Sequence, residues 1–403
     1  MSLSKSYLLS ACLVYSCVAM DNPIKVVFNG SCITTNPYIS IVSKKENDQY
    51  IITRVRQKRA YSRKETDTNI NLIIPSIVDK LQVSIAPMAF KRMLKRPRRA
   101  TVLVSIQFQS VDGNHVEYPE DCSELFAEST SITDIDISGL NPNQVIETTQ
   151  KMFYGCTRLK SIKFGDFATT YVTNMGKMFK NCKSLQNLDL SCFDTSNVQN
   201  MHWMFSGCIS LTDLNIRLFD TSRVQQMEYM FKNCKNLSKL NVNNFDTSHV
   251  ISMKGMFLNC KTLQQLDLNT FNTSQVTSMN RMFDGCRNLI SIGIEKFDTS
   301  NVRNMAKMFK DCYNLSHIPL NGFSASYELC YLSSMFANCR SVAVIYMPSS
   351  FYPKSNVICM DRMFCGCINL SCIICSKEWN FEKDMNFTKC MNCCISYLIS
   401  QSV

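Results

Sequence analysis

The feature that most constrains this 403-residue chain is the dipeptide Met-Phe, which recurs at a fixed interval. Seven copies, from Met152-Phe153 to Met308-Phe309, follow one another every 26 residues, and two more begin at Met335 and Met363. Six equal intervals in succession indicate an internal repeat. A period of about 20–50 residues is typical of solenoids, in which each unit buries its apolar face only against its neighbours.

The leucines of one unit, residues 178–203, predict a short strand. Leu185, Leu188 and Leu190 have the L-x-x-L-x-L spacing that is typical of leucine-rich repeats. Leu188 and Leu190 are two residues apart, so we expect both to face the interior while Asp189 between them faces outward.

The second half of the unit predicts a helical turn. Val198, Met201, Met204 and Phe205 follow at three- and four-residue steps, as one face of a short helix or 3₁₀ turn would. We therefore predict an α/β repeat solenoid, a right-handed coil of short parallel strands with helical or 3₁₀ turns on the opposite face. About ten such units occupy residues 122–375.

Acidic residues recur between the strand and the predicted helical turn. Their side-chain oxygens suit the N-terminus of a helix, where backbone N–H groups lack partners. Calcium binding is the alternative, but capping explains the repetition more simply. The residues are Asp166, Asp194, Asp220, Asp246 and Asp298.

The repeats are flanked by three other segments. Residues 1–20 are interpreted as a secretory signal peptide, because Lys5 precedes an uncharged, mostly apolar stretch at 7–19. A buried first strand or helix of a cytosolic protein is the alternative. Residues 21–121 are predicted to be a β-rich basic region, with strands near 26–28, 50–52, 81–85 and 102–108. Residues 376–403 are predicted to be a Cys-rich C-terminal cap.

The positive charge is concentrated near the front of the chain. The formal net charge is +11, and residues 21–120 hold 16 Lys and Arg against 9 Asp and Glu. The run from Lys91 to Arg99 is compatible with a nuclear signal, a nucleic-acid patch, a polyanion-binding loop or a solvated loop. The repeats are close to neutral, which argues against a protein that binds nucleic acid over its whole surface.

Nine of the 22 cysteines occupy a single repeat position. Stacked in a solenoid, their Cβ atoms would lie roughly 5 Å apart, beyond the ~3.5–4.5 Å that a disulfide needs. We expect buried free thiols that act as small apolar fillers, with disulfides or metal along the ladder as alternatives. The recurring methionines are likewise expected in the core. The nine cysteines are Cys156, Cys182, Cys208, Cys234, Cys260, Cys286, Cys312, Cys339 and Cys367.

The C-terminal cysteines suggest a different arrangement. Cys372 and Cys375 form one C-x-x-C pair, and Cys390 and Cys393 form a second. Two such pairs are a four-thiolate zinc spacing. Disulfides that close the end of the solenoid and free thiols are the rival interpretations, and in one hypothesis Cys390 or Cys393 bridges to the last strand. Our main prediction contains no metal and no cofactor.

The whole repeat pattern resembles one known family. Leu-x-x-Leu-x-Leu followed by Phe-Asp-Thr-Ser-x-Val-x-x-Met-x-x-Met-Phe-x-x-Cys is similar to the BspA-like leucine-rich-repeat surface proteins, and the match covers residues 125–375. The resemblance implies a secreted or surface-attached protein that binds host or matrix proteins and is not an enzyme.

No catalytic motif stands out in the sequence. None of the four His belongs to an H-E-x-x-H, and no P-loop or G-x-S-x-G is present. We predict a non-enzymatic, secreted or cell-surface protein that binds a protein or glycan through the strand face of the solenoid. A merely solvated strand face is the alternative. The expected partner-binding residues are Asn187, Asp189, Asp213, Asn215, Lys239, Asn241, Gln265, Asp267 and Glu295.

A second hypothesis places the chain inside a cell. It could be an interaction protein or a host-delivered effector, with a nuclear or nucleic-acid role for the segment from Arg92 to Arg99. The N-terminus of the mature chain separates the two hypotheses, because export predicts cleavage near Met20.

Overall fold

A computed structural model describes most of the chain as two compact units. The described residues are 12–14, 24–25, 27–29, 39–46, 49–57, 68–78, 81–91, 102–352, 359–375 and 398–401. Unit 1 comprises residues 1–172 and 181–193, and unit 2 comprises residues 173–180 and 194–403.

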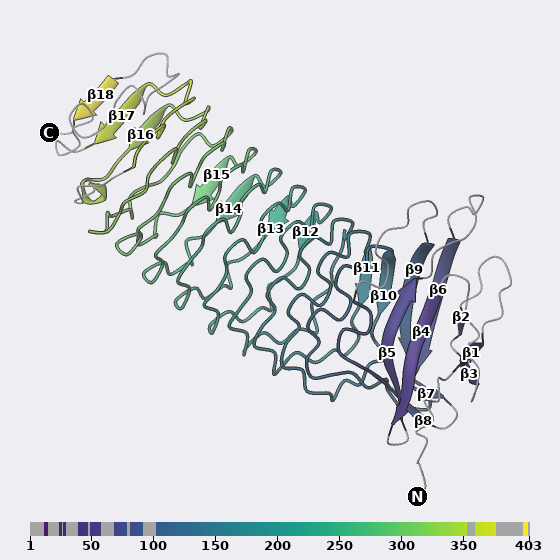
Figure 1. Ribbon diagram of the computed structural model, residues 1–403. Coiled ribbons are helices and arrows are strands. Elements are labelled where there is room, and N and C mark those ends of the chain that lie inside the picture. The colour runs from purple at the N-terminus through teal and green to yellow at the C-terminus, as the bar shows by residue number, and fades with distance from the viewer. Residues whose placement is uncertain are drawn as a thin grey trace, which may run out of the picture. The chain divides into compact units, whose positions relative to one another are not determined.

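The described residues of unit 1 form three sheets (Figure 1). The largest has the order β11-β10-β9-β6-β2, and all of its neighbouring strands are parallel. Its strands are β2 (Ile24–Lys25), β6 (Thr68–Pro75), β9 (Val102–Gln109), β10 (Ile132–Asp136) and β11 (Ser161–Lys163). Because β9 pairs with β10, the first repeat strand continues a sheet that begins before the repeats.

The other two sheets of unit 1 contain antiparallel pairs. One has the order β4-β5-β8-β7, and its strands are β4 (Ile39–Glu46), β5 (Gln49–Gln57), β7 (Ile77–Val78) and β8 (Leu81–Ile85). The other pairs β1 (Cys12–Val14) with β3 (Val27–Asn29). The strand predicted at 81–85 is confirmed as β8, and the one at 102–108 lies within β9. The segment at 50–52 lies within β5, that at 26–28 overlaps β3, and β4 and β6 were not predicted.

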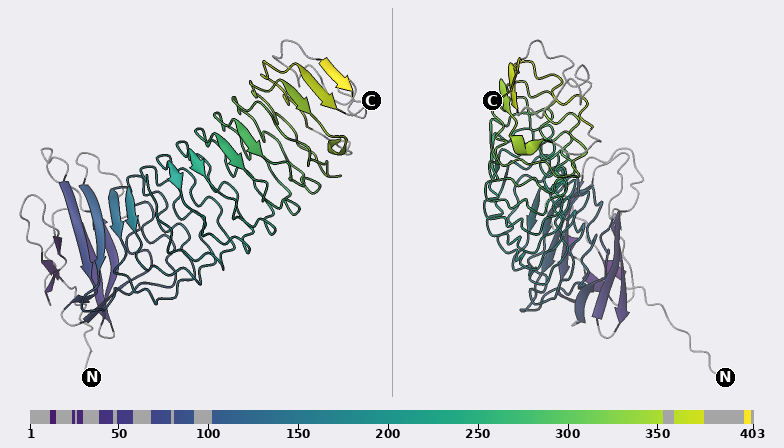
Figure 2. Two further views of the ribbon diagram at one scale, coloured as in Figure 1. Left: turned by 180° about the vertical axis from the view of Figure 1, so that it is seen from behind. Right: turned by 90° about the vertical axis from the view of Figure 1, so that its left-hand side faces the viewer.

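Unit 2 consists of coils of a parallel β-solenoid (Figure 2). Parallel pairs join β12 to β13 and β14 to β15 at a register of 26 residues, and a three-stranded sheet has the order β16-β17-β18. The elements are β12 (Asp213–Leu214), β13 (Lys239–Leu240), β14 (Gln265–Asp267), β15 (Ser291–Gly293), β16 (Val344–Tyr346), the 3₁₀ helix η1 (Ser349–Phe351), β17 (Cys372–Cys375) and β18 (Leu398–Gln401).

The interior of these coils is made of columns of identical residues. The phenylalanines of the Met-Phe pairs stack on one another in unit 2, for example Phe205 on Phe231 with ring centroids 5.8 Å apart and Phe231 on Phe257 at 5.6 Å. Methionine, cysteine and leucine columns are buried beside them, as predicted. Stacking identical side chains lets each coil bury an apolar face that it could not bury alone.

The predicted helical turns opposite the strands are absent from the described coils, in which the 3₁₀ helix η1 directly follows β16 and lies at a different repeat position. In unit 2 the N–H groups of Met175, Lys177 and Phe179 each donate to a carbonyl of the next coil, over N···O distances of 2.9 Å. A helix would direct these N–H groups into its own segment. Lys177 also has φ of 61°, and left-handed residues interrupt a right-handed helix. The three- and four-residue spacing therefore produces inward-facing side chains without a helix.

A second left-handed residue follows in each repeat. It stands directly before the recurring cysteine, and it is always glycine, asparagine or aspartate, the residue types that adopt positive φ most readily. The column is Gly155, Asn181, Gly207, Asn233, Asn259, Gly285, Asp311, Asn338 and Gly366.

The recurring aspartates cap turns, and the prediction that they cap helices is wrong. Oδ1 of Asp246 accepts the N–H of Ser248 at 2.9 Å, and Asp194, Asp220 and Asp298 make the same bond two residues along. This is an Asx-turn, a local alternative to a helix cap. The next residue serves a different purpose, because the buried Thr247 donates from Oγ1 to the carbonyl of Asn272 in the following coil at 2.8 Å.

Candidate binding surface

The strand face presents the predicted partner-binding side chains to solvent. Along β12, β14 and β15, the buried Leu214, Leu266 and Ile292 follow exposed polar residues, as the spacing of two predicts. All nine predicted residues are exposed. Asn187 and Asp189 belong to unit 1, and the other seven belong to unit 2.

Five of the seven in unit 2 line one shared hollow. It has a volume of about 740 Å³ and runs across strands β12, β13 and β14. The predicted residues that line it are Asp213, Asn215, Lys239, Asn241 and Gln265. Arg217, Ser238 and Gln264 add further polar side chains that the sequence analysis did not include.

Eight of the nine predicted residues form two columns with different roles, and Glu295 stands at a third repeat position. Asp189, Asn215, Asn241 and Asp267 each accept, at Oδ1, a backbone N–H two residues ahead, so these side chains close the turn after the strand. The bond to Ser191 lowers the pKa of Asp189. This column is therefore partly structural.

The side chains of the second column do not close turns. In the strand register, Asp213 lies opposite Lys239 on the neighbouring strand, and Gln265 lies opposite Ser291. Within the part of the chain that the structure describes, the side chains of Asp213, Lys239 and Gln265 make no hydrogen bond or ion pair. These three residues can contact a partner without giving up an internal bond.

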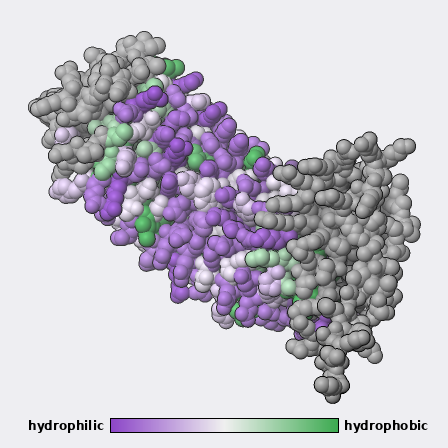
Figure 3. Space-filling view, in the orientation of Figure 1, coloured by the Kyte–Doolittle hydropathy of each residue, from purple (hydrophilic) through white to green (hydrophobic). Residues whose placement is uncertain are grey.

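The rest of the visible repeat surface has no large apolar patch. Figure 3 shows a mostly hydrophilic face over the repeat coils, with isolated hydrophobic residues. The exposed apolar residues Leu218, Ile251 and Ile290 lie at three different repeat positions, so they do not stack into a stripe.

The recurring cysteines are buried in the core, as predicted, and also make a contact that was not predicted. Each donates from Sγ to the carbonyl oxygen of a phenylalanine in the preceding coil, as Cys234 does to Phe205 at 3.1 Å. Burial raises the pKa of Cys234 and of Cys286 to about 12. The neutral thiol therefore persists at physiological pH, which makes these sulfurs poor nucleophiles and poor metal ligands.

The proposed zinc cysteines do not converge where the structure describes them. Cys375 is buried while Cys372 is half-exposed, because residues three apart on β17 point to opposite faces of the strand. Cys390 and Cys393 lie outside the described residues. Among the described residues, no group of three or more His, Cys, Asp and Glu side chains could hold a metal ion.

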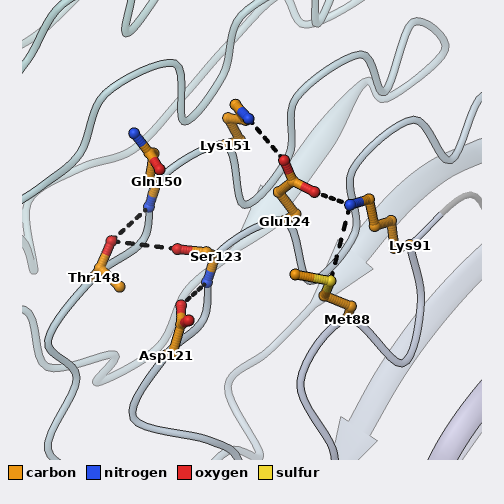
Figure 4. A network of polar contacts seen from close by, with 8 residues as sticks. All are labelled: Met88, Lys91, Asp121, Ser123, Glu124, Thr148, Gln150 and Lys151. Atoms are coloured by element: carbon orange, nitrogen blue, oxygen red, sulfur yellow. Dashed lines mark hydrogen bonds and ion pairs between the residues drawn. The ribbon is translucent and has the colours of Figure 1, made fainter.

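A polar network in unit 1 contains the first residue of the predicted basic run (Figure 4). Glu124 forms ion pairs with Lys151 at 2.8 Å and with Lys91. Hydrogen bonds from these lysines, Lys151 first, lower the pKa of Glu124. Lys91 thus anchors its segment to the repeats, while residues 92–99 lie outside the described part of the chain.

The repeats match a known family model. The family described as "Mycoplasma protein of unknown function, DUF285" matches residues 120–239, 209–323 and 265–375, which together span more than half of the chain. A search of curated proteins finds no match. No helix among the described residues has the length and apolar character needed to cross a bilayer.

Three solved structures are similar to this chain at low identity. A leucine-rich repeat protein from Bacteroides ovatus is 16% identical, with 91% of this chain and 100% of that chain covered and a TM-score of 0.36. A leucine rich cell surface protein from Faecalibacterium prausnitzii is 15% identical, with 92% and 96% covered and a TM-score of 0.37. The leucine-rich repeat protein of T. pallidum is 19% identical, with 70% and 90% covered and a TM-score of 0.23. Similarity this weak carries no argument about function.

Proposed function

This chain belongs to the DUF285 family, and we propose that it is an exported, non-enzymatic repeat protein that binds another macromolecule through its strand face. The observation that carries the proposal is the hollow across β12, β13 and β14, whose lining includes five of the nine residues that sequence periodicity selected. A row of exposed polar side chains on stacked parallel strands is the surface that solenoid proteins use for recognition.

The partner that fits this hollow is a protein or a glycan. The second column contributes an acid, a base and an amide at Asp213, Lys239 and Gln265, so it offers both hydrogen-bond donors and acceptors. The surrounding surface adds Asn and Gln amides and little net charge. Such a surface favours a polar, hydrogen-bonding epitope over a strongly charged or apolar one.

The test changes residues of the second column, which make no internal bonds, and leaves intact the first column, which closes turns. We expect the triple variant Asp213→Ala, Lys239→Ala, Gln265→Ala to lose binding to purified extracellular-matrix proteins and glycans in a solid-phase panel, without a change in thermal unfolding. The matched control is Glu328→Ala, Arg303→Ala, Gln275→Ala. It also removes one acid, one base and one amide, and its Arg303–Glu328 ion pair is exposed and contributes little to stability.

Two results would count against the proposal. Equal binding by the triple variant and the wild-type chain would remove the strand face as the binding surface. A mature chain that begins at Met1 or Ser2, determined by N-terminal sequencing, would remove export, whereas a start near Met20 supports it.

A further inference from the structure

The segments that flank each Met-Phe pair carry most of the positive charge of unit 2. These segments run from three residues before each recurring phenylalanine to the residue after the recurring cysteine. Among the described residues of unit 2 they contain twelve Lys and Arg against four Asp and Glu. The remaining described positions of unit 2 contain five Lys and Arg against eight Asp and Glu. The flanking segments therefore carry a net charge of +8, whereas the other described positions of unit 2 carry −3.

The charge is least compensated in the first four coils. We define the lysine ridge as residues 176–180, 202–209, 228–235 and 254–261, which contain six lysines, no arginine and a single acid, Glu228. Within the described residues, none of the six forms an ion pair with a carboxylate. The lysines are Lys177, Lys180, Lys232, Lys235, Lys254 and Lys261.

Aromatic rings, and not carboxylates, contact three of the six lysines. The Nζ of Lys180 lies 3.7 Å from the centroid of the Trp203 ring, and that of Lys232 lies 4.7 Å from the same centroid. Tyr229 packs against Trp203 with centroids 4.2 Å apart and lies within 5.9 Å of Lys254. Cation–π contacts position the ammonium groups but leave their charge uncancelled.

Two groups on the ridge, Lys180 and His202, have a lowered pKa, in part because neighbouring lysines repel an added positive charge. Burial, followed by the charges of Lys177 and Lys232, lowers the pKa of Lys180. Burial, followed by Lys177 and Lys180, also lowers the pKa of His202. An anion on the ridge would relieve this repulsion.

We propose that the lysine ridge binds a linear sulfated polysaccharide. The ridge is a separate surface from the strand face, and the two proposals share no residue. Successive coils of a parallel solenoid repeat at roughly 4.8 Å, so the four coils set lysines along about 15 Å of one axis. A linear polyanion can follow such a row, and compact ammonium groups act as point charges toward its sulfates.

Other polyanions fit the ridge less well. Both rings are already engaged, with each other and with lysines, so they offer little to the base stacking on which single-strand binders depend. Arginine, the usual side chain for reading guanine, is missing from the ridge. None of the exposed large apolar residues of the described chain belongs to the ridge, and the half-buried Trp203 and Tyr229 are packed against each other and against lysines, so the ridge presents no apolar face to a membrane.

The test uses the full chain and a local signal. The sequence has two tryptophans, so the substitution Trp379→Phe leaves Trp203 as the single reporter inside the ridge. Heparin is the probe, and de-N-sulfated heparin, hyaluronate and a single-stranded DNA oligonucleotide are the comparisons. We expect heparin to change Trp203 fluorescence with an affinity that falls as salt rises. Each comparison polymer should bind at least about tenfold more weakly.

Matched variants assign the effect to the ridge. Lys180→Gln, Lys232→Gln, Lys254→Gln should weaken heparin binding by about tenfold or more and reduce the slope of log affinity against log salt by about two to three. The control Arg223→Gln, Lys296→Gln, Arg303→Gln removes the same charge from positions outside the ridge and outside the strand-face hollow, and it should stay within about twofold. If the triple ridge variant unfolds, the single variants at Lys235 and at the exposed Lys254 make the same comparison.

Three outcomes would overturn the proposal. They are an unchanged affinity in the folded ridge variants, an equal loss in the control, and DNA or hyaluronate binding as tightly as heparin. The strand-face variant Asp213→Ala, Lys239→Ala, Gln265→Ala should retain heparin binding, so failure of the proposed function and failure of the ridge are distinguishable.

Discussion

The thiol of Cys260 donates a hydrogen bond to the carbonyl oxygen of Phe231 across an Sγ···O distance of 3.2 Å. The same carbonyl accepts the N–H of Cys234 at 3.1 Å. A buried carbonyl has two lone pairs, and here the turn uses one while the next coil uses the other. The cysteine column therefore connects neighbouring coils, in addition to filling space between them.

Replacing Cys260 with alanine should weaken the stacking of coils. The substitution removes a buried sulfur and its hydrogen bond, so we expect a loss of about 1–2 kcal/mol in the free energy of unfolding. Urea unfolding followed by circular dichroism measures it. Cys359→Ala is the control, because Cys359 is exposed and its loss should cost under about 0.5 kcal/mol. Equal effects at both positions would show that the buried contact contributes nothing.

The buried thiols should also make the protein sensitive to alkali. Burial raises the pKa of Cys234 and Cys286 to about 12 from an ordinary thiol value of about 9. Above pH 9 the unfolded chain loses these protons while the folded chain keeps them, so stability falls as pH rises from about 9 toward 12, by up to ~1.4 kcal/mol per pH unit for each thiol. Below pH 9 the contribution is constant.

A double variant isolates this effect from the titration of lysine and tyrosine. Cys234→Ala, Cys286→Ala should be less stable than wild type at pH 7, and the difference should shrink between pH 9 and pH 11. Urea midpoints at pH 7, 9, 10 and 11 provide the comparison. Parallel pH profiles for the two proteins would contradict the assignment.

The repeat length and the identity of the core were predictable because they depend on spacing alone. Side chains such as Leu188 and Met204 must face inward in any coil that stacks at this period, whatever the backbone does between them. The turn opposite the strands was not predictable from spacing, because inward-facing residues three and four apart fit a helix equally well. The Asn, Gly or Asp before each cysteine, as at Asn181, favours a left-handed residue, but such a residue is also a common helix end and so does not exclude a helix. The other left-handed position gives no such signal, since Lys177 and Trp203 occupy it.

The candidate surfaces differ in how far the sequence revealed them. Outward alternation identified Asp213 and Lys239, but nothing local indicated that Asp189 and Asp267 also close turns, since that role depends on the backbone two residues ahead. The lysine ridge was hidden for a different reason. Lys180 and Lys254 are 74 residues apart and become neighbours of the same aromatic pair only when the coils stack.

Gly255 should be intolerant of alanine because of Tyr229. The residue has φ of +58°, and a Cβ added there would meet the Tyr229 ring. Left-handed strain costs an alanine about 1 kcal/mol, and displacing the ring adds a loss of contacts. Gly113→Ala is the matched control, because Gly113 has φ of +76° and no atom within 4 Å of the added Cβ. We expect the urea midpoint to fall more for Gly255→Ala, with a change in Trp203 fluorescence. The control should leave that fluorescence unchanged.

Asp246 provides a test of the Asx-turn column at acid pH. Its pKa is lowered by the backbone N–H of Ser248, then by the Ser248 side chain and by His249. A lowered folded pKa means that ionisation stabilises the fold above about pH 4 and that this contribution disappears as pH falls through the folded pKa. Asp246→Asn keeps an oxygen acceptor that does not titrate, whereas Asp246→Ala keeps none. At pH 7 we expect the order wild type, Asn, Ala in decreasing urea midpoint, with the alanine variant lower by roughly 0.5–1 kcal/mol. As pH falls below about 4, the gap between wild type and Asn should narrow while the alanine variant stays below both, and a constant gap would show that the carboxylate charge has no part in the turn.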